Sequence, residues 1–555
     1  MRFRRPTYLL APIFIALCSI VAGLLGGGGR ASAASSPDDA VNQSLKSFTK
    51  IYDAVEQNFA DQVKPDKAIY DGAIPAMLHT LDPHSNFFDP KEFSKLREDQ
   101  SGHYAGIGMM VGSRGNRTIV QYPFEGSPAF RAGLRPGDAI LEVNDQKTDS
   151  LSMSEVAEKL KGPKGTKVQV MISRDGHDKP LTFNITRDEI PRSSVPFAFF
   201  VRPGIAYVVI TAFNENTGKE LDEKLKKLGE KDIKGVVLDL RGNPGGLLNE
   251  GIDVASHFLK KGETVVSSYG RASPRKVYAA RADGTGKDYP IVVLVNRSTA
   301  SAAEIVSGAL QDHDRGWILG EPTFGKGLVQ QVFTLNDNTG LALTMAHYYT
   351  PSGRLIQRDY SAISFLDYYA HTNLDQKNST DVKMTDSGRT VYGGGGITPD
   401  ERYACATANW TQGNPYVCST EDKFNKFQAV VLRSNPGLLF NFAAHFFGPR
   451  PDASLPKGWE PDENVVNQFH DFLLDNKADF SEADFTANHD WLKRELKREF
   501  YITAFSFEDS ERAAIEQDPQ VLKALDSMTK AKGLLDNAKK LLVQRVNAQS
   551  APRGQ

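Results

Sequence analysis

The stretch from 290 to 330 limits the possible folds of this chain most strongly. It reads PIVVLVNRSTASAAEIVSGALQDHDRGWILGEPTFGKGLVQ. The pattern predicts a buried strand at Ile291 to Val295, then a small-residue turn and a helix that starts near Ser301. A second strand at Trp317 to Leu319 leads to a glycine-bounded turn that carries Lys326. The stretch therefore predicts an α/β core with a serine and a lysine on neighbouring turns.

The preceding segments also alternate apolar strands with helices. Strands are expected at Ile205 to Ile210 and Gly235 to Leu240, with a helix near Thr217 to Leu228 between them. A glycine-rich turn, 242–246, follows the second strand. We predict a sheet covered by helices over residues 188–405, with the functional turns at strand ends.

Length and charge restrict the class of protein. A chain of 555 residues forms more than one domain. Its 66 Lys and Arg are balanced by 68 Asp and Glu, and the basic residues are scattered. Without a strong basic field or a nucleic-acid motif, we expect no nucleic-acid partner.

The first 33 residues have the composition of a targeting segment. Arg2, Arg4 and Arg5 precede an almost wholly apolar run over residues 7–25, and Ala31-Ser32-Ala33 offers a cleavage site. The run is also just long enough to span a bilayer, so both a cleaved signal peptide and a retained membrane anchor fit. In either case we expect an exported body, periplasmic or extracellular.

Two cysteines remain after such a cleavage, Cys405 and Cys418. In an oxidising compartment they could close a short disulfide loop; two unpaired thiols are the alternative. A zinc site is disfavoured because no nearby histidine completes a ligand set.

Residues 44–100 are predicted to be mainly helical, since apolar side chains recur every three or four residues. A turn over Leu81 to Ser85 interrupts this region and holds His84, which is either a base or, as we favour, structural. A last helical region covers 420–550 and indicates no chemistry. Its final helix, about Pro519 to Val546, could be an oligomer interface or could simply pack on the body.

Residues 101–187 change to alternating strands and glycine turns, and they resemble a PDZ domain of the bacterial protease-associated kind. The resemblance rests on Gly106-Ile107-Gly108-Met109 and on the run AGLRPGD at 132–138. It implies that an extended peptide adds to a sheet edge and that the loop N–H groups bind its terminal carboxylate. Met109, Met110 and Val111 would line a side-chain pocket, with ordinary core packing as the alternative.

Ser301 is a candidate nucleophile because it follows a strand and opens a helix, where developing negative charge is stabilised. Taken alone, Ser301 to Glu304 also matches a capping box, S-x-x-E. Asp312 and His313 are excluded as direct partners, because a continuous helix places them roughly 16 to 18 Å away.

Lys326 is the better candidate base. Burial between two glycines and apolar residues would favour its neutral amine, although an isolated Gly-Lys-Gly more often holds a surface lysine. A phosphate loop is disfavoured, because no Ser or Thr follows the lysine. The 242–246 turn could supply oxyanion donors, bind a nucleotide or be a plain turn.

Together these segments resemble a family, the carboxyl-terminal processing (tail-specific) proteases, which form subfamily A of peptidase family S41. The resemblance covers about residues 45–400 and rests on five motifs. They are TASAAEI at 299–305, GEPTFGKG at 320–327, DLRGNPGG at 239–246, LDPHS at 81–85 and YYTPSG at 348–353, beside the PDZ-like segment.

The resemblance implies that Ser301 is the nucleophile, that Lys326 is the general base and that Gln330 orients the lysine. It also implies oxyanion donors at the amides of Gly245 and Ala302. Because four residues of straight strand span about 13 Å, the chain has to bend after Lys326 for the lysine and Gln330 to meet.

We therefore expect a multidomain α+β protein: an N-terminal helical region, a PDZ domain, an α/β protease core related to the crotonase-like fold, and C-terminal helices. The expected activity is that of an exported serine endopeptidase that cleaves proteins near their C-termini without metal, nucleotide or other cofactor. The alternatives are a non-catalytic PDZ scaffold that binds C-terminal tails and a crotonase-type acyl-CoA enzyme.

Overall fold

The computed structural model describes residues 37–281, 287–361, 365–369, 378–403, 407–408, 418–419, 425–433, 437–449 and 455–550. The predicted targeting segment and Cys405, and with Cys405 the predicted disulfide, lie outside these residues. Among the residues described, no helix is both long enough and apolar enough to cross a membrane. The chain divides into two compact units, 1–76 and 77–555.

The first unit is helical over the residues described. It contains α2 (Pro37–Asn58), α3 (Pro65–Ala68) and the start of α4 (Ile74–His79), with a π-helical turn over Ile69–Ala73. The predicted helix from about residue 44 is confirmed, and the next predicted helix is divided by the π turn. The apolar side chains of α2 stay exposed and recur every three or four residues: Val41, Leu45, Phe48, Ile51 and Val55.

In the second unit, residues 109–186 form an antiparallel sheet with its own apolar core. The strand order is β3-β4-β5-β7-β8, with β6 paired to β5. The strands are β3 (Met109–Arg114), β4 (Arg117–Pro123), β5 (Ala139–Val143), β6 (Gln146–Lys147), β7 (Lys167–Ser173) and β8 (Leu181–Thr186), and the helices are α6 (Pro128–Ala132) and α7 (Met153–Leu160). A two-stranded ribbon, β2 (His103–Gly106) with β9 (Asp188–Pro191), pairs the chain entering this domain with the chain leaving it.

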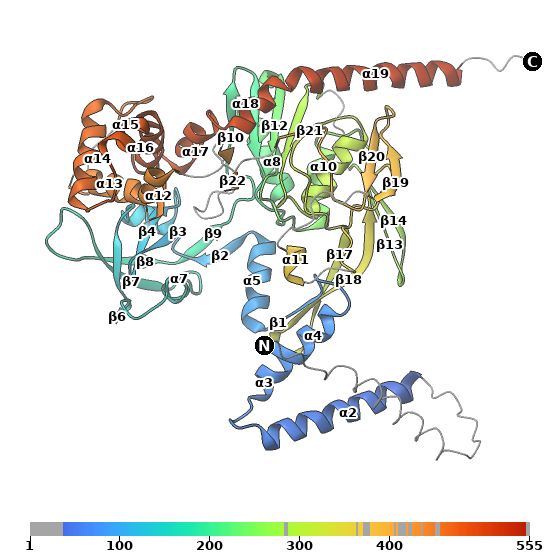
Figure 1. Cartoon of the computed structure of the whole chain (residues 1–555), viewed down its shortest axis with the longest axis horizontal. Coiled ribbons are helices and arrows are strands. Elements are labelled where there is room, and N and C mark those ends of the chain that lie inside the picture. The colour runs from blue at the N-terminus through green and yellow to red at the C-terminus, as the bar shows by residue number, and fades with distance from the viewer. Residues whose placement is uncertain are drawn as a thin grey trace, which may run out of the picture. The chain divides into compact units, whose positions relative to one another are not determined.

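The predicted α/β core is a six-stranded sheet of order β10-β11-β12-β15-β16-β21, parallel except for the β10–β11 pair. Its strands are β10 (Ala198–Arg202), β11 (Ile205–Val209), β12 (Gly235–Asp239), β15 (Ile291–Val295), β16 (Trp317–Gly320) and β21 (Glu401–Arg402). One face is covered by α8 (Thr217–Leu228), α9 (Leu248–Ser256) and α10 (Ala302–Asp312). The other face packs against α17 (Phe507–Ile515), α18 (Pro519–Asp526) and α19 (Met528–Ser550) (Figure 1).

A second, antiparallel sheet has the order β1-β18-β13-β14, with β17 also on β18. Its strands are β1 (Asn86–Phe88), β13 (Thr264–Gly270), β14 (Ser273–Ala279), β17 (Leu328–Thr334) and β18 (Gly340–Tyr349). Regular structure is also present within the polar segment over residues 360–390. A short helix, α11 (Phe365–Tyr369), and a β19–β20 hairpin (Asn378–Met384 with Thr390–Gly393) are formed there.

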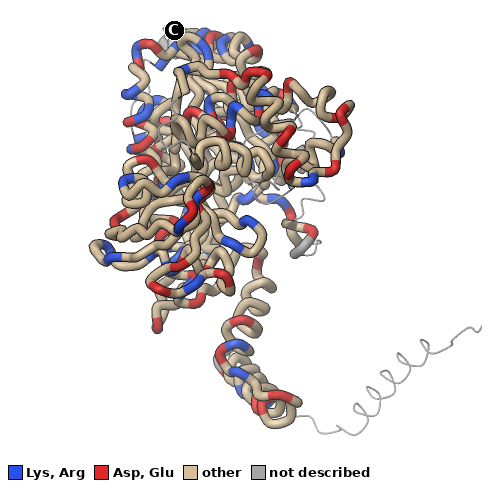
Figure 2. The backbone as a smooth tube through the Cα atoms, turned by 90° about the vertical axis from the view of Figure 1, so that its left-hand side faces the viewer, with Lys and Arg blue, Asp and Glu red and all other residues tan. Residues whose placement is uncertain are grey.

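The C-terminal region is helical, as predicted. Its first helices share a core rich in phenylalanine: α12 (Lys426–Arg433), α13 (Leu438–Phe447), α14 (Glu463–Asp475), α15 (Glu482–Ala487) and α16 (His489–Ala504). The single final helix expected from Pro519 is instead two helices that meet at Ser527, whose hydroxyl donates to Glu401 Oε2 at 2.7 Å. Figure 2 shows acidic and basic residues interspersed along the chain.

Candidate active site

Ser301 lies in the turn that joins β15 to α10. Its φ of 53° and ψ of −116° are unusual for any residue other than glycine. Such a conformation persists only where neighbouring contacts hold it, and it is common at functional sites. Ser301 directly precedes the first turn of α10, where the helix dipole favours negative charge nearby.

One buried carboxylate joins the turn of Ser301 to the turn of Lys326. Glu304 Oε2 accepts the backbone N–H of Ser301 at 2.8 Å and that of Lys326 at 2.9 Å. Glu304 Oε1 accepts the N–H of Gly325 at 2.7 Å and the hydroxyl of Thr323 at 2.5 Å. The S-x-x-E pattern predicted the first of these bonds; the other three come from a segment about twenty residues away.

The four partners of Glu304 are all donors, which is the set that an ionised carboxylate requires. The side chain is fully buried. Burial raises the pKa of Glu304, while the hydrogen bonds act in the opposite direction. The carboxylate therefore holds both turns together. In return, the hydrogen bonds from both turns stabilise its buried charge.

Lys326 and Gln330 meet. The Lys326 amine donates to Gln330 Oε1 at 3.0 Å. The required bend lies at the end of this stretch, where the β17–β18 pairing shifts between Val329 and Gln330. Gly325, with a φ of +85°, turns the chain directly before the lysine. Burial lowers the pKa of Lys326, and the carboxylates of Glu304 and Asp82 partly oppose this.

The turn over Leu81 to Ser85 also holds the Gln330 side chain, by way of its amide N–H2 group. The Gln330 amide donates to the backbone carbonyl of His84. Asp82 stabilises the turn, because its Oδ1 accepts the N–H of His84 at 2.7 Å and of Ser85 at 2.8 Å. The His84 ring contacts the hydroxyls of Tyr368 and Tyr369 at 3.0 and 3.2 Å.

Burial, with help from the Lys326 charge, lowers the pKa of His84 to about 3. The ring is therefore neutral at ordinary pH. It belongs to an apolar patch beside the serine, in which Tyr368 packs against Ala300 and Phe324. Arg358 lies over the Phe324 ring at 4.9 Å.

The glycine turn approaches Ser301 closely. A Cβ added to Gly245 would lie 2.6 Å from Ser301 Cβ and 2.9 Å from the Ala302 nitrogen, so only glycine fits. The Gly245 N–H donates to Asn243 Oδ1 at 2.8 Å and is thus occupied. Over the part of the chain that is described, the Ala302 N–H has no acceptor.

Asp312 and His313 lie at the far end of α10, as the helix arithmetic predicted. Asp312 forms a buried ion pair with Arg354 at 2.7 Å, and His313 Nδ1 contacts Asp386 Oδ2 at 2.7 Å. Within the described residues, no three His, Cys, Asp or Glu side chains are grouped to hold a metal ion.

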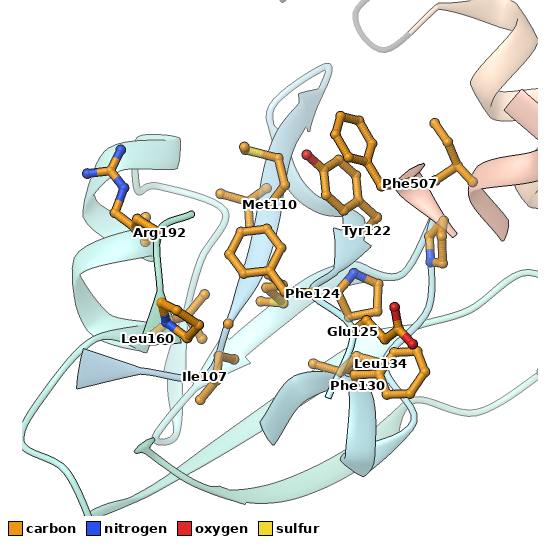
Figure 3. Close-up of a pocket in the computed structure, with 18 of the residues that line it drawn as sticks. Ile107, Met110, Tyr122, Phe124, Glu125, Phe130, Leu134, Leu160, Arg192 and Phe507 are labelled. Atoms are coloured by element: carbon orange, nitrogen blue, oxygen red, sulfur yellow. The ribbon is translucent and has the colours of Figure 1, made fainter. Parts of the chain in front are cut away.

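A cavity of about 1740 Å³ borders the predicted carboxylate loop. Ile107 and Gly108 line it together with Leu160 of α7 and Phe507 of α17 (Figure 3). The loop carbonyls are already engaged: Ile107 O accepts the Ala129 N–H at 2.8 Å, and Gly108 O accepts the Ser127 hydroxyl at 2.6 Å. Within the described chain, the N–H groups of Ile107 and Gly108 have no hydrogen-bond acceptor.

The three residues expected in this pocket all line the cavity, but their side chains lie on different faces of β3. They are Met109, Met110 and Val111. Met109 is buried in the domain core, and Val111 is partly buried against it. Met110 is 41% exposed and pairs across the ladder with Tyr122. The Tyr122 ring stacks on Phe507 with centroids 4.8 Å apart.

Comparison with known proteins agrees with this architecture. Residues 204–362 match the model of peptidase family S41, and residues 119–174 match a PDZ domain. A carboxy-terminal-processing protease of Bartonella bacilliformis is 35% identical over 359 residues, which are 64% of this chain and 80% of that protein. A carboxy-terminal processing protease of Bacillus subtilis is 32% identical over 360 residues, 63% of this chain and 74% of that protein.

The chain belongs to the carboxy-terminal processing proteases of peptidase family S41. It is thus a serine-type peptidase with a PDZ domain. Among solved structures, the photosystem II D1 C-terminal processing protease is 29% identical and has a TM-score of 0.33, with 68% of this chain and 89% of that one covered.

Sequence reasoning missed two features of this protease. It treated Glu304 only as a helix cap, although the carboxylate also binds three groups of the lysine turn. It gave the Leu81 to Ser85 turn no part in holding Gln330. The sequence motifs include both segments. No local pattern, however, predicts the long-range hydrogen bonds that Glu304 and Gln330 form.

We predict that Glu304→Gln destabilises the protease by about 3 kcal/mol or more and abolishes most of its activity. Glutamine has one acceptor oxygen, so its amide nitrogen would face backbone N–H donors. Thermal unfolding and hydrolysis of an unstructured protein measure the two effects. The control is Glu223→Gln on α8, where the exposed Glu223 pairs with the exposed Lys219 and the expected cost is about 1 kcal/mol or less. Equal behaviour of the two variants would contradict the bridging role of Glu304.

Proposed function

We propose that Ser301 is the nucleophile of this protease, that Lys326 is its general base and that Gln330 orients the amine. One observation carries the proposal: the turns of Ser301 and Lys326 are fastened to the same buried carboxylate, with the amine held by Gln330. Burial lowers the pKa of Lys326, which favours the neutral amine that a base requires.

In the proposed reaction Ser301 Oγ attacks the carbonyl carbon of the scissile peptide bond, and its proton passes to Lys326 Nζ. The oxyanion accepts the N–H of Ala302, and that of Gly245 once the latter exchanges its bond to Asn243. Collapse of the intermediate breaks the C–N bond, and Lys326 returns the proton to the leaving amine. Water, deprotonated by Lys326, then hydrolyses the acyl-enzyme.

We further propose that the PDZ domain binds the C-terminal tail of a substrate and gates the active site. The N–H groups of Ile107 and Gly108 border the cavity and have no acceptor among the described residues, which supports carboxylate binding by the loop. The basic start and apolar run of residues 2–25 support export, with the N-terminal segment as either a cleaved signal or an anchor.

Ser301→Ala is expected to lower hydrolysis of an unstructured protein by about 10³-fold or more, because no other group replaces the nucleophile. Lys326→Ala should cause a loss of about 10² to 10⁴-fold. Initial rates on casein, followed by mass spectrometry of the products, measure both. Ser298→Ala, in the same turn, is the matched control and should retain activity. Wild-type rates in Ser301→Ala would refute the mechanism.

The activity should depend on the protonation of Lys326. Below its pKa the amine is charged and cannot accept the serine proton, so kcat/KM should fall tenfold per pH unit. Because burial lowers this pKa, the plateau should be reached below 10.5, the ordinary lysine value. A pH profile of kcat/KM measures the midpoint. A profile that still rises past 10.5, or that is flat, would contradict a lysine base tuned by burial.

Tail capture predicts a dependence on the free C-terminal carboxylate of the substrate. A peptide substrate with a C-terminal amide should show a KM about tenfold higher, since the loop loses a charge-assisted partner. Ala157→Glu, which places a carboxylate on the cavity side of α7, should produce the same increase for the free acid. Lys159→Glu, on the same helix but outside the cavity lining, is the control. Equal KM values for acid and amide would exclude this mode of binding.

A further inference from the structure

Arg241 directly precedes the glycine turn 242–246, which we call the oxyanion turn because it carries Gly245. Two of the partners of Arg241 come from a distant part of the chain. Its side chain is fully buried at the end of β12. On one side Nη2 donates to Asp239 Oδ2 at 2.6 Å. On the other side Nη1 donates to Asp518 Oδ2 at 2.9 Å and to Gln520 Oε1 at 3.1 Å. Asp518 and Gln520 lie at the start of α18, 277 and 279 residues later in the chain.

This cluster joins buried charges from the end of β12 and from the start of α18. Asp518 and Gln520 are buried together with Arg241, and Tyr207 donates its hydroxyl to Asp239 Oδ2 at 2.6 Å. Buried charges of this kind are stable only when each has its partners, and removal of one leaves the others uncompensated. Arg241 is therefore held from two sides: Asp239 accepts from its Nε and Nη2, and α18 supplies Asp518 and Gln520 to its Nη1. Without α18, Nη1 would lose both of these partners.

The backbone on either side of Arg241 is tied to the serine turn. The Leu240 carbonyl accepts the Thr299 hydroxyl at 2.8 Å, and the Gly242 N–H donates to Asn296 Oδ1 at 2.9 Å. Two residues on, the Asn243 carbonyl accepts the N–H of Ala300 at 2.9 Å. A displacement of Arg241 would thus move the turn that places Gly245 against Ser301.

Asp518 also caps α18, and this role can be separated from its contact with Arg241. Its Oδ1 caps α18 by accepting the N–H of Gln520 at 2.8 Å and of Val521 at 3.1 Å, while Oδ2 faces Arg241. Asparagine is an equally good N-cap, so Asp518→Asn keeps the helix start. On the side of Arg241 it removes the charge and replaces the accepting oxygen with an amide N–H donor.

We infer that Asp518, assisted by Gln520, is a positioning residue for the oxyanion turn, so that the C-terminal region contributes to the chemical step and not to substrate binding. The inference rests on the proposed role of Ser301 as nucleophile. Asp518 lies well beyond residues 204–362, the segment that matches the peptidase family. The C-terminal helices therefore complete the active site from outside the matched core.

The test combines steady-state kinetics with covalent labelling of the serine. A fluorophosphonate forms a bond from phosphorus to Ser301 Oγ, fluoride leaves, and the serine proton passes to Lys326; the rate of this step depends on the oxyanion turn. Full-length Asp518→Asn should lower kcat and the labelling rate by the same factor, about 10 to 100-fold, with KM within twofold of wild type. Gln520→Met, which removes one neutral acceptor, should lower both about threefold.

Two controls separate positioning from stability. Asp526→Asn makes the same change at the exposed end of α18 and should leave all rates unchanged. Ile515→Ala loosens the packing of this region on the sheet without touching Arg241, so it should lower the melting temperature but keep kcat per labelled serine. The inference is wrong if Asp518→Asn keeps the wild-type kcat per labelled serine. This includes the case in which Asp518→Asn behaves like Ile515→Ala and lowers only the melting temperature.

The outcomes also distinguish this inference from the proposed function. Wild type and Ser301→Ala are measured in the same assays. Labelling or cleavage that persists in Ser301→Ala refutes the nucleophile and, with it, the inference. Labelling that requires Ser301 but is equally fast in wild type, Asp518→Asn and Gln520→Met refutes the inference alone. Should Asp518→Asn not fold, the kcat and labelling rate of Gln520→Met decide.

Discussion

The geometry around Ser301 depends on the carboxylate of Glu304. A buried charge needs every one of its donors, and each donor lost would cost about 1–3 kcal/mol. Two of the four bonds of Glu304 end on the backbones of Ser301 and Lys326 themselves. The turns cannot separate without leaving that charge exposed to an apolar interior. The same bonds hold Ser301 in a backbone conformation that a serine would otherwise leave.

The sheet explains why these turns meet at all. In a parallel sheet the carboxyl ends of neighbouring strands lie at one edge. The strands β12, β15 and β16 are consecutive and parallel, and they end at the glycine turn, the serine turn and the lysine turn respectively. Both faces of the sheet are buried, one by α8 to α10 and the other by α17 to α19. This is why strands such as IVVLV are apolar at every position.

Much of this arrangement could be predicted from local patterns. The strands at 291–295 and 317–319, the helix after Ser301 and the exclusion of Asp312 follow from periodicity and helix geometry. The contact between Lys326 and Gln330 could not be predicted from spacing, because it needs a shift in register within β17. The contact between Arg241 and Asp518 joins residues 277 positions apart. No local propensity encodes such a contact; it exists only once the sheet has formed and α18 has packed on it.

The C-terminal helices restrict the PDZ domain as well as the sheet. Phe507 of α17 stacks on Tyr122 of the PDZ domain, and its ring also lies against that of Phe197, directly before β10, with centroids 6.4 Å apart. One aromatic side chain therefore lies between the cavity beside the carboxylate loop and the edge of the catalytic sheet. The PDZ domain cannot move relative to the core without breaking this stack or displacing α17. Since only three residues separate α17 from α18, a displacement of α17 acts on the helix that holds Arg241.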